Sequence, residues 1–365
     1  MSYQNKEIIF FLPNFSQGGA SESTVKLMTY LKKKGFECSL ICLGNCFYKK
    51  ELKKNKIKLV EIEETKTFYA MFKIRKFIEK NKNKKIFFIS NINYSNVLSI
   101  IFLRKFENLK IILYERTPIQ ELNFSYCEIL RFIKNLIIRI LIKYTYPKAD
   151  KIIANSKTTS KDLSLHIKKR VKTIYSKSIK KIFKYKQVKK SDVTNILWVG
   201  RFSNEKSFVT LIDAIYLLKS LKIKITVLGD SPEKEIYVKK IKQLNLKKSF
   251  KFLGYKSKID TIFKNSNLYV STSLYESFPN SIIQAINYSL PIISSKSFGG
   301  VNEILKNQTY GTFYEAGNSR DLADKILNFI KKPKKFLYKA KLAHKSLHNY
   351  EFHKLEEKFL KEILF

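Results

Sequence analysis

The sequence predicts an α/β protein built from two doubly wound domains in tandem. Short apolar runs alternate with longer amphipathic stretches along most of the chain, a pattern typical of parallel strands joined by helices. The alternation stops at the polar, basic segment 177–191 and then begins again. The 365 residues are too many for one ordinary domain but suit two domains of about 170 residues each.

The first domain is predicted over residues 1–178. Helix candidates such as 23–34 and 72–81 separate its apolar runs, so we expect the strands to be parallel. The predicted strands are EIIFFLP, ECSLICLG, KIFFISN, KIILYER and KIIANS, in chain order.

The second domain is predicted over residues 179–345, with the strands NILWVG, KITVLG, SFKFLG, LYVSTS and LPIISS. The last segment, 346–365, places Phe352, Leu355, Phe359 and Ile363 on one face of a helix. Because such a face needs an apolar partner, we expect this helix to pack back on the first domain. Two open sheets in tandem are expected to face a cleft at the carboxyl ends of their strands.

The most apolar window, 129–146, carries Arg131, Lys134, Arg139 and Lys143. Each of these charges would cost about 2.5–3.5 kcal/mol at the centre of a bilayer, so a spanning helix is not expected. An interfacial helix and an ordinary buried helix both remain open. The first residues lack the features of a secretory signal, so we expect a cytoplasmic protein, either free or attached peripherally to the inner face of the cell membrane.

The formal net charge of +41 invites a nucleic-acid or anionic-glycan binding role. However, only eight of the 71 basic residues are Arg, and neither zinc-finger spacing nor an RNA-binding aromatic motif is present. Compositional drift explains much of the charge, and an anionic membrane surface or anionic substrate could account for the remainder.

Three loops at predicted strand ends carry the candidate site. In LPNFSQGGASES, Gly18 and Gly19 precede a helix, either to let a ligand approach the backbone or to form a tight turn. In LWVGRFSNEKSF, Arg201 and Lys206 could direct two cations at one diphosphate, or could be a solvated surface pair.

The third loop lies in STSLYESFPNSIIQAINYSLPII, where Glu276 stands between an apolar strand and an apolar helix. A docked polar ligand would explain that carboxylate, although a simple loop charge is the alternative. In the sequel SSKSFGGVNEIL, we expect Gly299 and Gly300 to form a turn that leaves free N–H groups at a helix start. Glu303 could bind a ligand or merely favour the helix dipole.

Together these motifs resemble the retaining family 4 glycosyltransferases of the GT-B fold, of the type that makes bacterial surface polysaccharides or lipid-linked glycans. The resemblance covers most of the chain. It rests on Gly18-Gly19-Ala20, ADKIIANS, GRFSNEK, YESFPNSIIQA and GGVNE.

The resemblance implies two Rossmann-like domains, with the acceptor bound mainly by the first and a nucleotide-diphosphate sugar mainly by the second. It implies catalytic roles for Glu276, Arg201 and Lys206, of which the two cations bind the diphosphate and Glu276 binds sugar hydroxyls. Gly18, Gly19, Glu115 and Arg116 would form the acceptor or phosphate loop. The implied donor-binding residues are Arg201, Lys206, Glu276, Phe278, Pro279, Asn280, Ser281, Gln284, Gly299, Gly300 and Glu303.

Two departures from the family pattern bear on the substrates. Gln284, implied to bind the ribose, replaces a second glutamate, and Glu115-Arg116 stands where many relatives have a histidine. A comparable Glu-Arg pair is found in a subset that includes transferases of N-acetylhexosamines.

We therefore expect a retaining hexosyl- or N-acetylhexosaminyltransferase that acts on a glycan or lipid-linked acceptor in cell-surface polysaccharide biosynthesis. A UDP-sugar is the expected donor. No Asp-x-Asp motif is present, so we expect neither a metal nor another cofactor. The alternatives are a sugar-nucleotide epimerase of the same fold and a basic protein that binds nucleic acid or anionic glycan.

Overall fold

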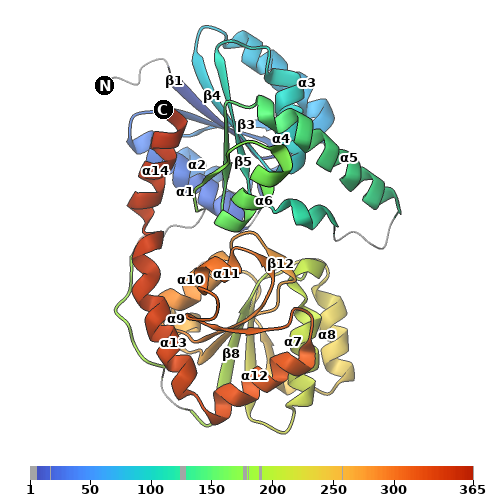
Figure 1. Ribbon diagram of the computed structural model, residues 1–365, viewed down its shortest axis with the longest axis vertical. Coiled ribbons are helices and arrows are strands. Elements are labelled where there is room, and N and C mark those ends of the chain that lie inside the picture. Colours follow the sequence, from blue (N-terminus) through green and yellow to red (C-terminus); the bar gives the residue numbers. More distant parts are fainter. Residues whose placement is uncertain are drawn as a thin grey trace. The chain divides into compact units, whose positions relative to one another are not determined.

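The chain folds into two compact units, each with its own parallel sheet (Figure 1). The first unit comprises residues 1–178 and 352–365, and the second comprises residues 179–351. These two sheets confirm the predicted α/β class. The computed structural model describes residues 6–16, 18–123, 129–175, 179, 181–188, 191–256 and 258–364.

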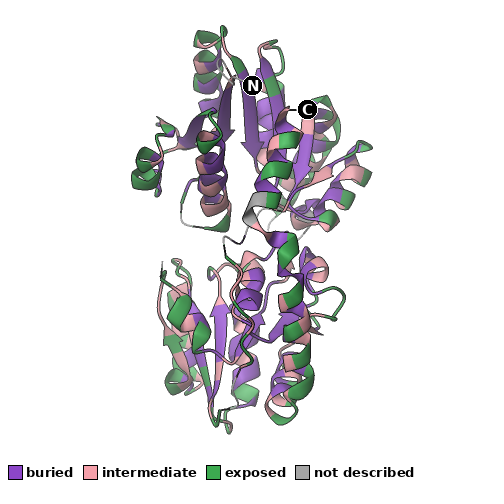
Figure 2. Cartoon of the chain, turned by 90° about the vertical axis from the view of Figure 1, so that its left-hand side faces the viewer, coloured by how far each residue is buried: buried purple, intermediate pink, exposed green. Residues whose placement is uncertain are grey.

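The first sheet has seven strands in the order β3-β2-β1-β4-β5-β6-β7, and all neighbouring strands are parallel. Its central strands are buried (Figure 2), because helices cover both faces and leave no side for polar residues. The strands are β1 (Lys6–Phe11), β2 (Glu37–Leu43), β3 (Lys58–Ile62), β4 (Lys85–Asn91), β5 (Leu109–Glu115), β6 (Lys151–Ala154) and β7 (Lys172–Thr173).

The helices of the first unit form two layers with separate apolar cores. On one face of the sheet are α3 (Thr67–Lys80), α4 (Asn93–Leu103), α5 (Ile129–Thr145) and α6 (Lys157–Ile167). On the other face are α1 (Gly19–Lys33), α2 (Lys49–Lys54) and α14 (Phe352–Leu364). Helices α1 and α3 begin four or five residues before the predicted starts at 23 and 72.

The C-terminal helix α14 belongs to the first unit although it follows the second in sequence. Phe359 lies 6.5 Å from Phe10 and 5.6 Å from Tyr114 between ring centroids, and Ile363 is buried in the same core. The Lys172–Glu362 ion pair, at 3.1 Å, adds a polar contact to this packing. The side chain of Phe352, predicted to share this apolar face, lies outside the described residues.

The second sheet has six strands in the order β10-β9-β8-β11-β13-β15, beside a two-stranded ribbon of β12 and β14. Helices α7, α8 and α12 share one core with this sheet. The strands are β8 (Thr194–Val199), β9 (Ile223–Leu228), β10 (Phe250–Phe252), β11 (Leu268–Ser271), β12 (Tyr275–Glu276), β13 (Ile292–Ser295), β14 (Phe298–Gly299) and β15 (Thr312–Tyr314). The helices are α7 (Phe208–Leu217), α8 (Lys234–Gln243), α9 (Asp260–Lys264), α10 (Asn280–Asn287), α11 (Val301–Ile304), α12 (Ser319–Lys331) and α13 (Lys334–Lys345). Short 3-10 helices occur in both units. In the first unit they are η1 (Ile119–Asn123) and η2 (Tyr146–Lys148), and in the second they are η3 (Asn204–Lys206), η4 (Lys247–Ser249) and η5 (Ser346–Tyr350).

Each sheet has one point where its strand order reverses. In the first sheet β1 lies beside β4, and in the second β8 lies beside β11. At such a point the loops that follow the two strands diverge, so ligands of open α/β sheets bind there. None of the described helices is long and apolar enough to cross a membrane.

Candidate functional site

Two of the predicted loops meet at the reversal point of the second sheet. The loop with Arg201 and Lys206 follows β8, and the loop with Glu276 follows β11. Because β8 and β11 are adjacent and parallel, with Leu268 opposite Ile196, both loops leave the same edge of the sheet. The backbone N–H of Leu274 donates to the carbonyl of Glu205 at 2.8 Å and joins the loops directly.

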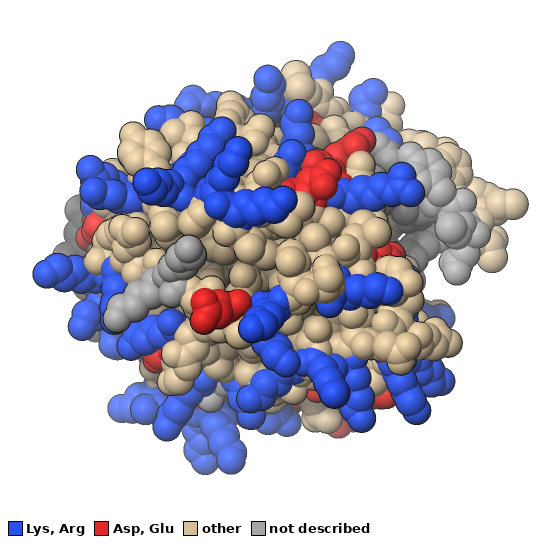
Figure 3. Space-filling model, turned by 90° about the horizontal axis from the view of Figure 1, so that it is seen from below, with Lys and Arg blue, Asp and Glu red and all other residues tan. Residues whose placement is uncertain are grey.

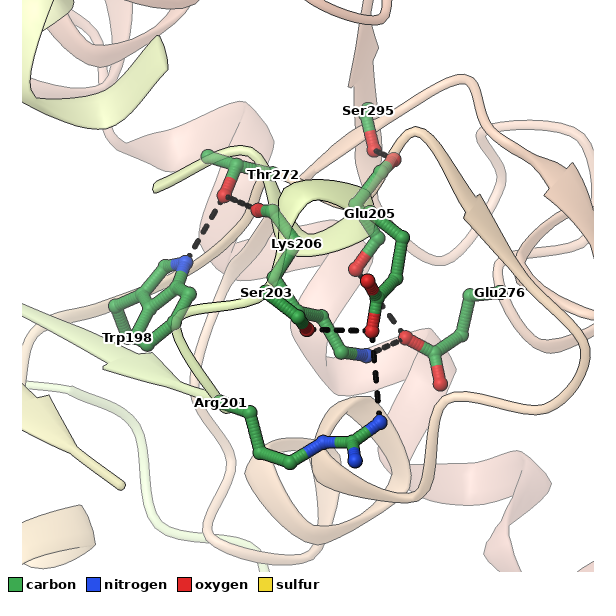
Figure 4. Close-up of polar contacts among 9 residues, drawn as sticks. Trp198, Arg201, Ser203, Glu205, Lys206, Thr272, Glu276 and Ser295 are labelled. Carbon is green, nitrogen blue, oxygen red and sulfur yellow. Dashed lines mark hydrogen bonds and ion pairs between the residues drawn. The ribbon is translucent and has the colours of Figure 1, made fainter. Parts of the chain in front are cut away.

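Lys206 and Glu276 form an ion pair between these loops (Figure 4). The ammonium group donates to Oε2 of Glu276, and the hydroxyl of Ser273 donates to the same oxygen at 3.2 Å. The two charged side chains are 20% and 21% exposed, so they are partly shielded yet open to a ligand. Seventy positions apart in sequence, they are brought together by the neighbouring strands.

The backbone beneath Lys206 is held by a chain of hydrogen bonds. Thr272 Oγ1 donates to the carbonyl of Lys206 at 2.6 Å and accepts from the indole Nε1 of Trp198 at 2.9 Å (Figure 4). Trp198 is buried at the end of β8. A cation whose backbone is fixed in this way has little backbone entropy left to lose when it binds an anion.

Arg201 lies on the same loop but is 66% exposed. Its guanidinium group is 3.5 Å from Oε1 of Glu205, which also accepts from the hydroxyl of Ser203. Glu205 was absent from the predicted site residues. The four-residue spacing from Arg201, which is the spacing of ion pairs on one helical turn, was the available signal.

Gly299 and Gly300 hold the Glu276 loop from the other side. Strands β12 and β14 pair, with Glu276 opposite Gly299. Gly299 has φ +119°, and a Cβ atom there would lie 2.0 Å from the carbonyl oxygen of Glu276, so only glycine fits. The expectation that Gly300 offers a free N–H is wrong, because that group donates to the carbonyls of Glu276 and Ser277 at 3.0 and 2.9 Å.

The remaining predicted donor residues lie on and around α10 and α11. Phe278 and Pro279 are buried, and the ring of Phe278 packs 6.1 Å from that of Tyr350. The side-chain oxygen of Asn280, at the start of α10, is buried without a hydrogen-bond partner in the described structure. The others, Ser281 and Gln284 on α10 and Glu303 in the first turn of α11, are half-buried.

In the first unit, Gly18 precedes α1, and Gly19 is the first residue of that helix. Arg116 ties the start of α1 to the ends of β4 and β5. Its NH1 donates to the hydroxyl of Ser23 at 2.7 Å, its NH2 to that of Thr24 at 3.0 Å, and its Nε to Oδ1 of Asn91 at 2.9 Å. Arg116 thus fixes the helix that follows the glycine pair.

Glu115 occupies a separate buried network. Its carboxylate accepts from the hydroxyl of Tyr146 at 2.6 Å and from the hydroxyl and N–H of Thr117 at 2.8 and 3.1 Å. Burial raises the pKa of the Glu115 carboxyl and outweighs these hydrogen bonds, which lower it. Because Glu115 and Arg116 are 1% and 8% exposed, both serve as internal supports in this structure.

The described residues contain no group of three or more His, Cys, Asp or Glu side chains arranged to hold a metal ion. At the reversal point of the second sheet, the contacts described above bring together two cations and two carboxylates: Arg201, Lys206, Glu205 and Glu276. Such a set can bind a group that carries both phosphate oxygens, for the cations, and hydroxyls, for the carboxylates.

The chain is similar to known glycosyltransferases. Residues 179–345, nearly the whole second unit, match the model of a family described as Glycosyl transferases group 1. Amylovoran biosynthesis glycosyltransferase AmsD of Erwinia amylovora is 32% identical over 121 residues, which are 33% of this chain and 34% of AmsD. The curated relatives that match next are covered over 53–61% of their length.

Two longer matches cover nearly the whole chain. A Campylobacter jejuni protein named GalNAc-alpha-(1->4)-GalNAc-alpha-(1->3)-diNAcBac-PP-undecaprenol alpha-1,4-N-acetyl-D-galactosaminyltransferase is 25% identical, with 98% of each chain aligned. The crystal structure of Anabaena HepE in complex with UDP-glucose superposes with a TM-score of 0.80 at 18% identity, over 98% of this chain and 99% of HepE. These matches confirm the two-domain GT-B fold and the resemblance that the motifs predicted.

Proposed function

We propose that this chain is a retaining glycosyltransferase that moves a hexose or N-acetylhexosamine from a nucleotide-diphosphate sugar to a glycan or lipid-linked acceptor in cell-surface polysaccharide biosynthesis. The observation that carries the proposal is the contact between Lys206 and Glu276 at the reversal point of the second sheet. That unit is also the one that matches Glycosyl transferases group 1.

In the proposed reaction, the donor's diphosphate takes the place of Glu276 as the partner of Lys206. Arg201, which is exposed and contacts Glu205, turns to the same phosphates. The freed Glu276 carboxylate accepts hydrogen bonds from sugar hydroxyls. As the bond between the sugar C1 and the diphosphate breaks, the leaving group gains negative charge, and the two cations stabilise it electrostatically.

The acceptor hydroxyl forms its new bond to C1 on the face from which the diphosphate departs, so the anomeric configuration is retained. Its proton passes to a phosphate oxygen of the leaving group. The chain's own part is to orient the sugar through Glu276 and to neutralise the diphosphate, with no covalent intermediate on a side chain.

A UDP-N-acetylhexosamine and a polyprenyl-diphosphate glycan are the preferred substrate classes. The Campylobacter relative is named for transfer of N-acetylgalactosamine to a glycan on diphospho-undecaprenol. HepE was crystallised with UDP-glucose. A purely basic binding protein is less well supported, because Lys and Arg lie in several groups separated by other residues on the face seen in Figure 3 and form no single track there.

The function is tested by incubating the purified full chain with labelled UDP-N-acetylhexosamines or UDP-glucose and a short polyprenyl-diphosphate glycan in EDTA. We expect the acceptor to gain one sugar, with an α linkage from an α donor because the configuration is retained. Transfer should proceed in EDTA because Lys206 and Arg201 supply the positive charge. A donor at 100 times its dissociation constant should also stabilise the fold by about 2.7 kcal/mol.

Three outcomes would contradict this proposal. A new nucleotide sugar formed without acceptor would identify an epimerase. Loss of transfer in EDTA with recovery in Mg²⁺ would show that the reaction needs a metal. If no nucleotide sugar supports transfer and none stabilises the fold against heat, the chain is not a sugar-nucleotide enzyme.

Gln284→Glu is expected to tighten donor binding several-fold, and Gln284→Ala to weaken it. Residue 284 lies one turn into α10, where it is half-buried. A carboxylate there would accept ribose hydrogen bonds with charge assistance, a gain of about 1 kcal/mol over the amide. Calorimetric titration with UDP measures both changes.

The matched control is Gln243→Glu, which makes the same change at an exposed position at the end of α8. If both glutamate variants bind UDP alike, the effect comes from net charge alone. If neither change at 284 alters affinity, Gln284 is a packing residue of α10.

A further inference from the structure

Helix α5 presents a long apolar face to solvent. Its buried side, with Ile138 and Ile142, packs into the core of the first unit beside Tyr146. The opposite side carries large apolar residues that are 46–84% exposed. They are Ile129, Leu130, Phe132, Ile133, Leu136, Ile137, Ile140 and Tyr144.

The helical spacing of these residues makes them one continuous stripe. From Ile129 the positions recur after three, four, seven, eight, eleven and fifteen residues, which is the pattern of a single helix face, and Leu130 lies at the edge of that face. Monomeric proteins seldom expose so many contiguous large apolar side chains unless the surface binds something. Helix α5 is therefore buried on one side only, and the two interpretations open from the sequence differ in what covers its other side.

A second exposed apolar group lies in the same helix layer. Helices α3, α4 and α5 lie side by side over one face of the first sheet (Figure 1). Phe68 and Phe72 of α3 pack edge-to-face against Phe102 of α4, with ring centroids 5.6 and 5.0 Å apart. Phe68 and Phe72 are nevertheless 43% and 50% exposed, as is the neighbouring Ile101 at 54%.

The charges on this layer are almost all positive. Helix α5 contains no Asp or Glu, and α4 contains no charged residue at all. Lys134 and Lys143 of α5 are exposed; helical spacing puts Lys134 beside one border of the apolar stripe and Lys143 near the other border. An apolar stripe with flanking cations is complementary to a surface that has hydrocarbon beneath anionic head groups.

The geometry points to an anionic lipid bilayer as the partner of this surface. We propose that α5 lies in the membrane interface with its apolar stripe among the acyl chains, while the aromatic group of α3 and α4 rests at the same level. At 17 residues α5 is about 25 Å long, and it lies flat because its buried side remains packed on the first unit. The inference rests on these exposed faces and is independent of the proposed reaction.

The test is flotation of the full-length chain with vesicles of phosphatidylcholine alone or mixed with phosphatidylglycerol. We expect co-flotation with the mixed vesicles, a several-fold weaker signal on neutral vesicles, and weakening at high salt, since the cations are screened. The double variant Ile133→Gln/Ile137→Gln should lose at least tenfold in vesicle partition, because it removes two apolar anchors.

The matched control is Leu217→Gln/Ile236→Gln, which changes two exposed apolar residues of the second unit, 52% and 66% exposed. It should float like the unchanged chain. Equal circular dichroism and melting temperature of both variants separate loss of binding from loss of folding.

Absence of flotation with anionic vesicles at low salt would overturn the proposal, and so would equal flotation of the Ile133/Ile137 variant. A concentration-dependent dimer that this variant abolishes, in a chain that does not float, would assign the surface to a second copy instead. Because flotation needs no turnover, a failure here leaves the proposed function untouched.

Discussion

Glu276→Ala should lower turnover about a thousandfold while the fold stays intact. In the proposed complex this carboxylate holds the transferred sugar through charge-assisted hydrogen bonds, each worth about 1.5–3 kcal/mol. The loop itself is held by the backbone, through the contacts of Gly300 with the Glu276 and Ser277 carbonyls. The side chain can therefore be removed without releasing the loop.

Single-turnover transfer from labelled donor measures this effect separately from product release. Glu276→Gln keeps the size and one acceptor oxygen, so it should recover part of the loss. The matched control is Asp213→Ala, which removes a half-buried carboxylate of α7 that is also paired with a lysine, Lys240, at 2.7 Å. Normal turnover by Glu276→Ala would show that this loop is not the sugar site, and an equal loss in Asp213→Ala would show that the effect is general.

The sequence predicted the fold because local pattern and global architecture agree. Runs such as KIFFISN are apolar on both faces, as a strand covered by helices on both sides must be, and this strand became the buried β4. The C-terminal helix could likewise be predicted from its apolar face, since Phe359 and Ile363 needed an apolar surface to pack against, which the first unit provides. The local pattern did not predict the start of α1 correctly, because this helix begins at Gly19 without a side-chain cap that would mark its first turn.

The site was predictable as far as strand order allowed. Lys206 and Glu276 each follow a strand, so their convergence needed only that β8 and β11 be neighbours. Contacts made within and between the loops could not be predicted from the sequence. The N–H of Gly300 donates to the carbonyls of Glu276 and Ser277, and the contact between Arg201 and Glu205 was signalled only by their four-residue spacing.

Glu115 and Arg116 illustrate the same limit. At the end of a strand, two adjacent charged residues suggest a ligand, but successive side chains point to opposite faces of a sheet. Here Arg116 reaches the hydroxyls of Ser23 and Thr24 on α1, whereas Glu115 reaches Tyr146 on the other side. Ser23 and Thr24 lie 93 and 92 positions from Arg116, and Tyr146 lies 31 positions from Glu115, so no local pattern reveals these contacts.

Lys206→Ala and Arg201→Ala are each expected to lower turnover by about two to three orders of magnitude. The reason is that a preorganised charge acts on the diphosphate as its negative charge develops, and removal of one such group costs about 2.7–4 kcal/mol in the transition state. Because the charge develops during the reaction, kcat should fall more than donor affinity. Donor titration and single-turnover rates, measured on the same protein, separate the two.

The best control for Lys206 is Lys240→Ala, because Lys240 also sits in the second unit and is also paired with a carboxylate, Asp213, at 2.7 Å. This variant should react at the normal rate. Lys206→Arg should recover part of the activity, since the guanidinium group restores the positive charge but differs from the ammonium group in shape and position. If Lys206→Ala and Lys240→Ala react equally fast, Lys206 merely neutralises Glu276, and the diphosphate must be bound elsewhere. If only Arg201→Ala is normal, Arg201 is a surface cation held by Glu205, and the backbone-anchored Lys206 alone carries the leaving-group charge.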